Sequence, residues 1–250
     1  MIRQRTIRKT VEVEGIGLQT GEKVRLALKS SAPDTGVTFI RTDLPDTPGL
    51  SINSLDLGAV GRMERRTALS IGPLEVQTIE HIMAALSGLS IDNVVIESDK
   101  PELPGLDGSA KGFVELLKEA GAQDQPSPKR FLEVTEPVWC EGENGAFLAA
   151  FPDGAFKVSY TLSYPAGSIG TQFFSSVIDQ KIFEREIAPA RTFCLEEEAM
   201  ELLRRGFGKG ANHENTLVIG RNGPLKTVPR FPDEPVRHKV MDLIGDLYLL

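Results

Sequence analysis

One stretch carries the strongest local pattern in the sequence: Val76-Gln77-Thr78-Ile79-Glu80-His81-Ile82-Met83-Ala84-Ala85-Leu86-Ser87-Gly88-Leu89. Its larger apolar residues recur at the spacing of one helix face, at Ile79, Ile82, Met83 and Leu86. Gly88 stands where a glycine typically ends a helix. We therefore predict a helix over residues 76–89 that buries this face and carries Glu80 and His81 in its first half.

Working outward from this helix, the first half of the chain predicts strands followed by helices. Period-two alternation and turn residues give these elements: strands over residues 6–17, 24–29 and 93–97, a loop over residues 41–58, and a helix over residues 110–120 capped by Ser109. The next segment, residues 121–128, is polar and contains two prolines, so we predict a linker there.

The second half repeats the order of the first. It predicts strands over residues 131–138, 147–151, 156–162 and 171–178, then a helix over residues 196–205 and another that begins near residue 233. We therefore predict an α+β fold of two similar domains, residues 1–122 and 129–250, each a sheet packed with helices. The active site is expected at the seam between the two domains, where ligand clefts are common.

The composition excludes several classes of protein. The 250 residues include 40% hydrophobic residues, which is too many for a disordered chain. A formal net charge of −7 argues against a nucleic-acid partner, because phosphate binding needs excess positive charge. Two cysteines give no disulfide framework, and we find neither a signal peptide nor an apolar run long enough to cross a membrane. We therefore expect a cytoplasmic protein.

Three histidines limit where a metal could bind. His238 and Asp242 are four residues apart in a predicted helix and so share a face, with Asp246 one turn further. An imidazole and a carboxylate on adjacent turns can both reach one Zn²⁺. The alternative is a solvated helix face on which His238 and Asp242 form a weak pair.

Glu80 and His81 offer a complementary arrangement in the first helix. As neighbours they lie about 100° apart around the axis, so His81 can bind a metal while Glu80 points at an adjacent water. Ligand plus neighbouring base is what metal-assisted amide hydrolysis needs. With His238 and Asp242, His81 completes three ligands and leaves a fourth position for water, as in catalytic zinc sites. The alternative is a polar edge of an otherwise buried helix.

These residues resemble a known family. Residues 76–81 and 84–93 are similar to the signature of the zinc-dependent UDP-3-O-acyl-N-acetylglucosamine deacetylases of lipid A synthesis. Further matching blocks occur in the same order: Gln4-Arg5-Thr6, Pro101-Glu102-Leu103-Pro104, Asp107-Gly108-Ser109-Ala110, Ala190-Arg191-Thr192-Phe193, and Val236-Arg237-His238-Lys239 continuing to Leu247. The resemblance implies hydrolysis of the N-acetyl group of a UDP-linked, acylated glucosamine, with release of acetate.

The resemblance also implies roles for individual residues. They are zinc ligation by His81, His238 and Asp242, general base catalysis by Glu80, oxyanion stabilisation by the Thr192 hydroxyl, a cationic contact to substrate by Lys239, and orientation of a further histidine by Asp246. Ferrous iron is the other candidate metal, because similar nitrogen and oxygen ligands bind it.

The sequence departs from the family in ways that leave an alternative open. The family carries a Ser-Gly-His block beyond the position of Leu250, and its histidine acts as a general acid. The third histidine, His213, is expected in a loop rather than in that role. The alternative prediction is therefore a truncated, catalytically impaired relative that binds zinc and a UDP-sugar. A metal-free interaction module is a further alternative, and the sequence gives no indication of oligomeric state.

Overall fold

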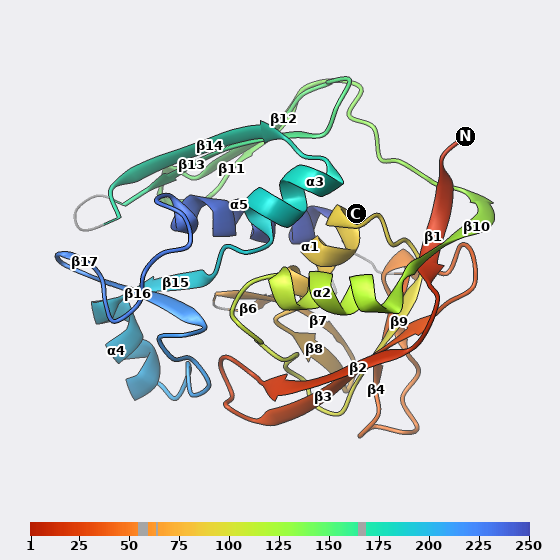
Figure 1. Cartoon of the computed structure of the whole chain (residues 1–250), viewed down its shortest axis with the longest axis horizontal. Coiled ribbons are helices and arrows are strands. Elements are labelled where there is room, and N and C mark those ends of the chain that lie inside the picture. Colours follow the sequence, from red (N-terminus) through yellow and green to blue (C-terminus); the bar gives the residue numbers. More distant parts are fainter. Residues whose placement is uncertain (55–59, 64, 165–168) are drawn as a thin grey trace.

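The computed structural model describes residues 1–54, 60–63, 65–164 and 169–250 (Figure 1). Its helices are α1 (Glu80–Gly88), α2 (Lys111–Ala120), α3 (Gln180–Ile182), α4 (Glu196–Arg204) and α5 (Glu234–Leu247). Its strands are β1 (Arg3–Ile7), β2 (Val11–Ile16), β3 (Lys23–Ser30), β4 (Val37–Arg41), β5 (Leu50–Ser51), β6 (Val60–Met63), β7 (Arg66–Ile71), β8 (Leu74–Gln77), β9 (Val94–Ser98), β10 (Ala122–Pro128), β11 (Val138–Glu141), β12 (Phe147–Ala150), β13 (Lys157–Ser163), β14 (Thr171–Val177), β15 (Thr192–Leu195), β16 (Thr216–Gly220) and β17 (Gly223–Pro224). This mixture of helices and mostly antiparallel sheets confirms the predicted α+β class.

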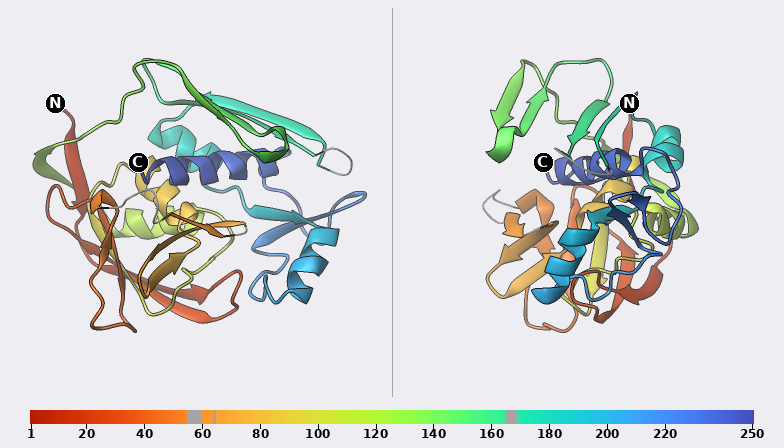
Figure 2. Two further views of the ribbon diagram at one scale, coloured as in Figure 1. Left: turned by 180° about the vertical axis from the view of Figure 1, so that it is seen from behind. Right: turned by 90° about the vertical axis from the view of Figure 1, so that its left-hand side faces the viewer.

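The sheets lie on both sides of a helical layer. A five-stranded sheet has the order β2-β3-β9-β4-β5, in which only β4 and β9 run parallel, and β6-β7-β8 form a second, antiparallel sheet. The hairpins β11–β12 and β13–β14 lie on the opposite side of α5, and β15 pairs in parallel with β16 (Figure 2). Helix α1 therefore lies between α2 and α5, well inside the molecule.

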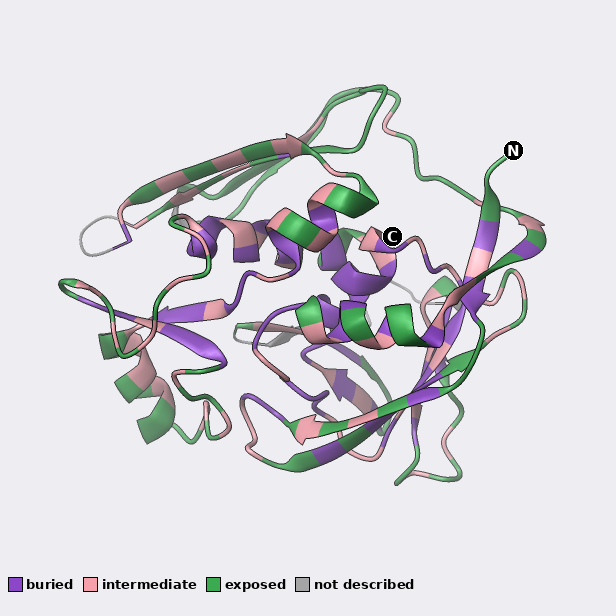
Figure 3. Cartoon of the chain, viewed as in Figure 1, coloured by how far each residue is buried: buried purple, intermediate pink, exposed green. Residues whose placement is uncertain are grey.

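Burial of α1 follows from its composition. Its first seven residues, Glu80 to Leu86, are all buried (Figure 3). The last five of these are apolar, so Glu80 and His81 are the polar groups that this helix buries. Ala84 and Ala85 allow close approach of neighbouring elements. On α5, a Cβ added at Gly245 would overlap the carbonyl oxygen of Glu80, so the two helix backbones touch at this point. Only glycine fits there, and this contact fixes α5 against the beginning of α1.

The main apolar core runs across the predicted domain boundary. It contains Leu86 and Phe113 from the first predicted domain together with Phe183, Val240 and Ile244 from the second. A smaller cluster is formed largely by β15 and β16 and includes Leu217 and Ile219. The division into residues 1–122 and 129–250 remains a prediction.

The predicted linker is wrong in one respect: residues 122–128 form strand β10, paired antiparallel with β1. Gln125 is buried beneath this pair, where its amide donates to the carbonyl of Ser31 at 2.8 Å and its oxygen accepts from Asn93 at 2.7 Å. Asn93 also donates to Gln4 at 2.8 Å. Because the strand buries hydrogen-bonded amides rather than apolar groups, no hydrophobic pattern marks it, and its prolines suit an edge strand.

Other predicted element boundaries also differ from those in the structure. The helix predicted from residue 76 begins at Glu80, because residues 74–77 form β8 and Thr78 has a φ of 58° that breaks helical geometry. The strand predicted over residues 131–138 begins only at Val138. The loop predicted over residues 41–58 contains β5, and its last four residues lie outside the described part of the chain. Within the described ranges, no helix is both long enough and apolar enough to span a bilayer.

Candidate metal centre and active site

Three of the predicted site residues converge on one point. His81 is the second residue of α1, and His238 and Asp242 occupy adjacent turns of α5. The Nε2 atoms of His81 and His238 lie 3.7 Å and 3.4 Å from Oδ1 of Asp242. One potential ligand atom from each residue lies within 4.8 Å of the others. The group therefore takes one histidine from the first predicted domain, residues 1–122, and the His/Asp pair from the second, residues 129–250.

A backbone carbonyl just before β15, that of Ala190, sets the tautomer of His238. Its Nδ1 lies 3.1 Å from the carbonyl oxygen of Ala190, which can only accept, so Nδ1 carries the proton and Nε2 keeps a free lone pair. Ala190 is itself held by the next residue. The Arg191 guanidinium forms a buried ion pair with Glu234 at the start of α5, at 2.9 Å, and the Arg191 backbone N–H donates to the same carboxylate.

The chemistry of this group fits a divalent cation. Oδ1 of Asp242 is buried and has no hydrogen-bond partner among the described residues, although it faces both imidazoles. Burial, with the charge of His238, lowers the pKa of His81 to about 4, and burial also lowers the pKa of His238. Neutral imidazoles and an ionised carboxylate are ligands that Zn²⁺ and Fe²⁺ accept.

Lys239 holds the other oxygen of Asp242. Its Nζ donates to Oδ2 at 3.0 Å. Burial alone would raise the pKa of Asp242, but His238 and Lys239 outweigh it and keep the pKa at about 2. The carboxylate in turn raises the pKa of Lys239, so its ammonium stays charged. The Lys239 Nζ also lies 5.8 Å from the centre of the Phe193 ring.

Glu80 and Asp246 lie on the flank of the ligand group. Burial, reinforced by the negative charge of Asp242, raises the pKa of Glu80 to about 8. One oxygen of Glu80 accepts from the backbone N–H of Thr67 at 3.1 Å. Asp246 reaches the surface with part of its side chain, but partial burial still raises its pKa to about 6. The Thr67 hydroxyl donates to Asp246 at 2.7 Å.

Thr192 is placed near the site only through its backbone. It begins β15 and donates its N–H to the carbonyl of Gly108 at 2.7 Å. It lies between Ala190, which contacts His238, and Phe193, whose ring meets the His238 ring edge to face at 6.3 Å. Within the residues that the structure describes, none of the site's hydrogen bonds uses the Thr192 hydroxyl.

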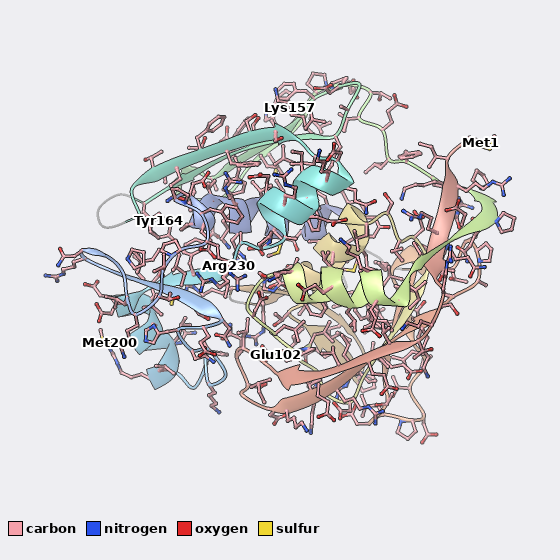
Figure 4. All side chains as sticks on the ribbon, in the orientation of Figure 1. Met1, Glu102, Lys157, Tyr164, Met200 and Arg230 are labelled. Carbon is pink, nitrogen blue, oxygen red and sulfur yellow. The ribbon has the colours of Figure 1, made fainter. Side chains whose placement is uncertain are left out.

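A second ion pair joins the loop after β9 to the segment before α5. Arg230, labelled in Figure 4, donates to Asp107 and to the carbonyl of Pro189, each at 2.8 Å. Asp107 also accepts from the Ser109 hydroxyl at 2.7 Å. Because Pro189 immediately precedes Ala190, this contact helps fix the carbonyl that faces His238. No spacing in the sequence indicated this pairing, which depends on folding.

The structure also places groups that sequence patterns did not indicate. Thr67 contacts both Glu80 and Asp246, yet it belongs to no motif and lies thirteen residues before Glu80 and 179 residues before Asp246. No element was predicted for the segment that forms β7. His213 lies in a turn and is not part of the ligand group.

The raised pKa of Glu80 predicts a pH effect on the metal-free protein. A carboxyl that ionises near 4.5 when unfolded and near 8 when folded favours folding at low pH, and this contribution is lost as pH rises toward 8. The lowered pKa of His81 acts in the opposite direction, but only below its ordinary value of 6.5. We therefore expect Glu80→Gln to reduce the loss of stability between pH 6.5 and 8, measured by denaturant unfolding after chelation. An exposed control, Glu136→Gln, should leave the wild-type pH dependence in place, and an unchanged slope in Glu80→Gln would contradict the assignment.

Comparison with known proteins places this site in a family. The family described as LpxC, UDP-3-O-acyl N-acetylglycosamine deacetylase, matches residues 4–250. The chain belongs to this family. A relative from Chlamydia abortus named UDP-3-O-acyl-N-acetylglucosamine deacetylase is 42% identical over 249 residues, which cover 99% of this chain and 87% of the relative.

Relatives in two other organisms have the same name. The protein from Bdellovibrio bacteriovorus is 38% identical over 252 residues, covering all of this chain and 82% of the relative. The protein from Chromobacterium violaceum is 38% identical over 253 residues, again with 82% of the relative covered. Similarity at this level over nearly the whole chain extends to both helices that carry the ligand group.

Proposed function

We propose that this protein hydrolyses the N-acetyl group of UDP-3-O-acyl-N-acetylglucosamine in lipid A biosynthesis, releasing acetate and a free amine. The names of its relatives support the substrate and the reaction. The observation that carries the proposal is the convergence of His81, His238 and Asp242 beside a buried carboxylate, Glu80. A site of this composition suits attack of water on an amide.

His81, His238 and Asp242 would hold the metal, which we propose to be Zn²⁺, with Fe²⁺ as the other candidate. Such an ion supplies Lewis acidity, which polarises an amide carbonyl and makes water more acidic. The protein contributes two neutral imidazoles, one of them fixed by the Ala190 carbonyl, and an ionised carboxylate steadied by Lys239. Partners of this kind orient ligands and preserve their protonation state.

Glu80 is the proposed general base. Its position next to His81, its burial, and the hydrogen bond that its Oε2 accepts from the Thr67 N–H support this role. A raised pKa makes it a stronger proton acceptor once it is ionised, and positive charge placed beside it favours that ionised form. The same carboxyl can then return the proton to the leaving amine or to solvent.

The remaining roles concern charge and orientation. The Lys239 ammonium, charged and partly accessible, is proposed to contact the anionic substrate. The Thr192 hydroxyl is proposed to donate to the oxygen on which negative charge develops. Asp246, with its pKa near 6, is proposed to hold a proton-bearing partner at the edge of the site.

The test is acetate release from UDP-3-O-acyl-N-acetylglucosamine by the purified full chain. We expect turnover in zinc-loaded protein, loss of turnover after chelation, and recovery when zinc is restored. Binding of the UDP-sugar without acetate release would instead support the catalytically impaired relative. Neither binding nor release, in protein shown to be folded and metal-loaded, would overturn the proposal.

A further inference from the structure

We propose that Thr67 is a positioning residue of this site, which holds the carboxylates of Glu80 and Asp246 in a fixed relation to each other. The inference rests on the proposed deacetylase function and adds a residue that no sequence motif indicates. Thr67 is the second residue of β7. Its backbone N–H donates to Oε2 of Glu80 at 3.1 Å, and its hydroxyl donates to Oδ1 of Asp246 at 2.7 Å.

The backbone carbonyl of Thr67 contacts the segment just before α1. Its carbonyl oxygen accepts from the backbone N–H of Thr78 at 2.9 Å and from that of Ile79 at 3.4 Å. Thr78 and Ile79 are the two residues just before α1, and Ile79 is its N-cap, so this acceptor fixes the segment from which α1 begins. Thr78 has a φ of 58°, which a threonine rarely adopts, and the bond to Thr67 helps hold it there.

These contacts fall where the two ligand-bearing helices touch. Gly245 packs directly on the carbonyl of Glu80, and the next residue along α5 is Asp246. Thr67, which lies on β7, therefore donates hydrogen bonds to both helices at the place where α1 and α5 touch. Its β-branched side chain has few rotamers, which suits a hydroxyl that must point in one direction.

The arrangement has a consequence for proton transfer. Glu80 and Asp246 both carry carboxyl groups, and Thr67 donates to each of them. If the Thr67 hydroxyl is lost, Asp246 is free to leave its place, and the backbone that carries the Glu80 hydrogen bond is less restrained. A general base must lie within hydrogen-bond reach of the proton that it takes, so this loss should act on the chemical step rather than on substrate affinity.

The first test compares Thr67→Val with Thr67→Ser in the zinc-loaded full chain. We expect Thr67→Val to lower kcat by about 10–100-fold, the usual effect of losing a group that orients site residues, with KM and zinc content nearly unchanged. Thr67→Ser keeps the hydroxyl and should restore most of kcat. Equal kcat in the wild type and Thr67→Val, or failure of Thr67→Ser to exceed Thr67→Val, would overturn the proposal.

A matched control separates positioning from simple loss of stability. Thr6 is a buried threonine of β1 whose hydroxyl donates to the carbonyl of Asn93 at 2.6 Å. The same hydroxyl accepts from the backbone N–H of Ser31 at 3.1 Å. Thr6→Val therefore removes at least as many side-chain hydrogen bonds as Thr67→Val at a different place in the fold, so it should lower the unfolding temperature without a selective loss of kcat. If it lowers kcat as much as Thr67→Val does, the effect of Thr67 is structural and the proposal fails.

A second readout does not depend on deacetylation. In the metal-free protein labelled with ¹⁵N-threonine, Glu80→Ala removes the acceptor of the Thr67 amide, so its proton resonance should move upfield while that of Thr6 stays in place. An unchanged Thr67 resonance would contradict the contact. If wild-type protein releases no acetate at any metal loading, the proposed function fails, and this comparison alone decides whether Thr67 holds Glu80.

Discussion

Replacement of Glu80 by glutamine should lower acetate release by about 10²–10⁴-fold while the zinc content of the protein stays normal. Glutamine has nearly the same size and can still accept the Thr67 N–H, so the local packing is preserved. It cannot take a proton from water, so only the chemical function of the carboxylate is lost. The measurement is kcat for acetate release together with metal analysis of the same preparation.

The zinc content decides between two roles for Glu80. A base leaves the metal in place when it is removed, whereas a ligand or a structural support takes the metal with it. Loss of zinc from Glu80→Gln would therefore remove Glu80 from the role of base. Glu136→Gln, at an exposed glutamate, provides the control and should change neither quantity.

Stability should move in the opposite direction from activity. Burial raises the pKa of Glu80 to about 8, which means that the folded protein resists the charge that the base needs. A neutral glutamine at this position should therefore make the metal-free protein more stable near pH 8. Such opposition between stability and activity is common where a site holds a charge in a buried place.

The sequence was most informative where local pattern and chemistry coincide. The helix that carries Glu80 and His81 was predicted from apolar spacing, and the four-residue spacing of His238 and Asp242 correctly placed them on one face of α5. Residue spacing could not show that these two helices meet. The contact depends on Gly245 packing on Glu80, and no local sequence pattern links these two positions. The chemistry of the three proposed ligand side chains suggested that they share one site, and the family resemblance strengthened that hypothesis.

Polar structure was harder to predict than apolar structure. Strand β10 was mistaken for a linker because its buried residue, Gln125, satisfies its amide through Asn93 and Ser31 rather than through an apolar neighbour. Thr67 was missed for a related reason: its hydrogen bonds to Glu80, Asp246, Thr78 and Ile79 are polar contacts between separate segments of the chain. Hydrophobic periodicity reports which face of an element is buried, but it carries no information about such pairings.

Replacement of His238 by alanine should remove most of the bound zinc. It deletes one of three ligand positions, so the loss of affinity should exceed the roughly 10–100-fold effect of removing a residue that only orients a ligand. His213→Ala is the matched control, because His213 lies in a turn outside the ligand group and should leave zinc binding unchanged. The measurement is zinc per protein at equilibrium with a competing chelator.

A fold defect could also release zinc, so a second variant is needed. Asp242→Asn keeps the size of the side chain and can still accept from Lys239, but it removes the negative charge that faces both imidazoles. It should lose zinc as His238→Ala does while the metal-free protein keeps a wild-type far-ultraviolet spectrum. Normal zinc content in both variants would exclude the His/His/Asp group as the metal site, and with it the chemical basis of the proposed hydrolysis.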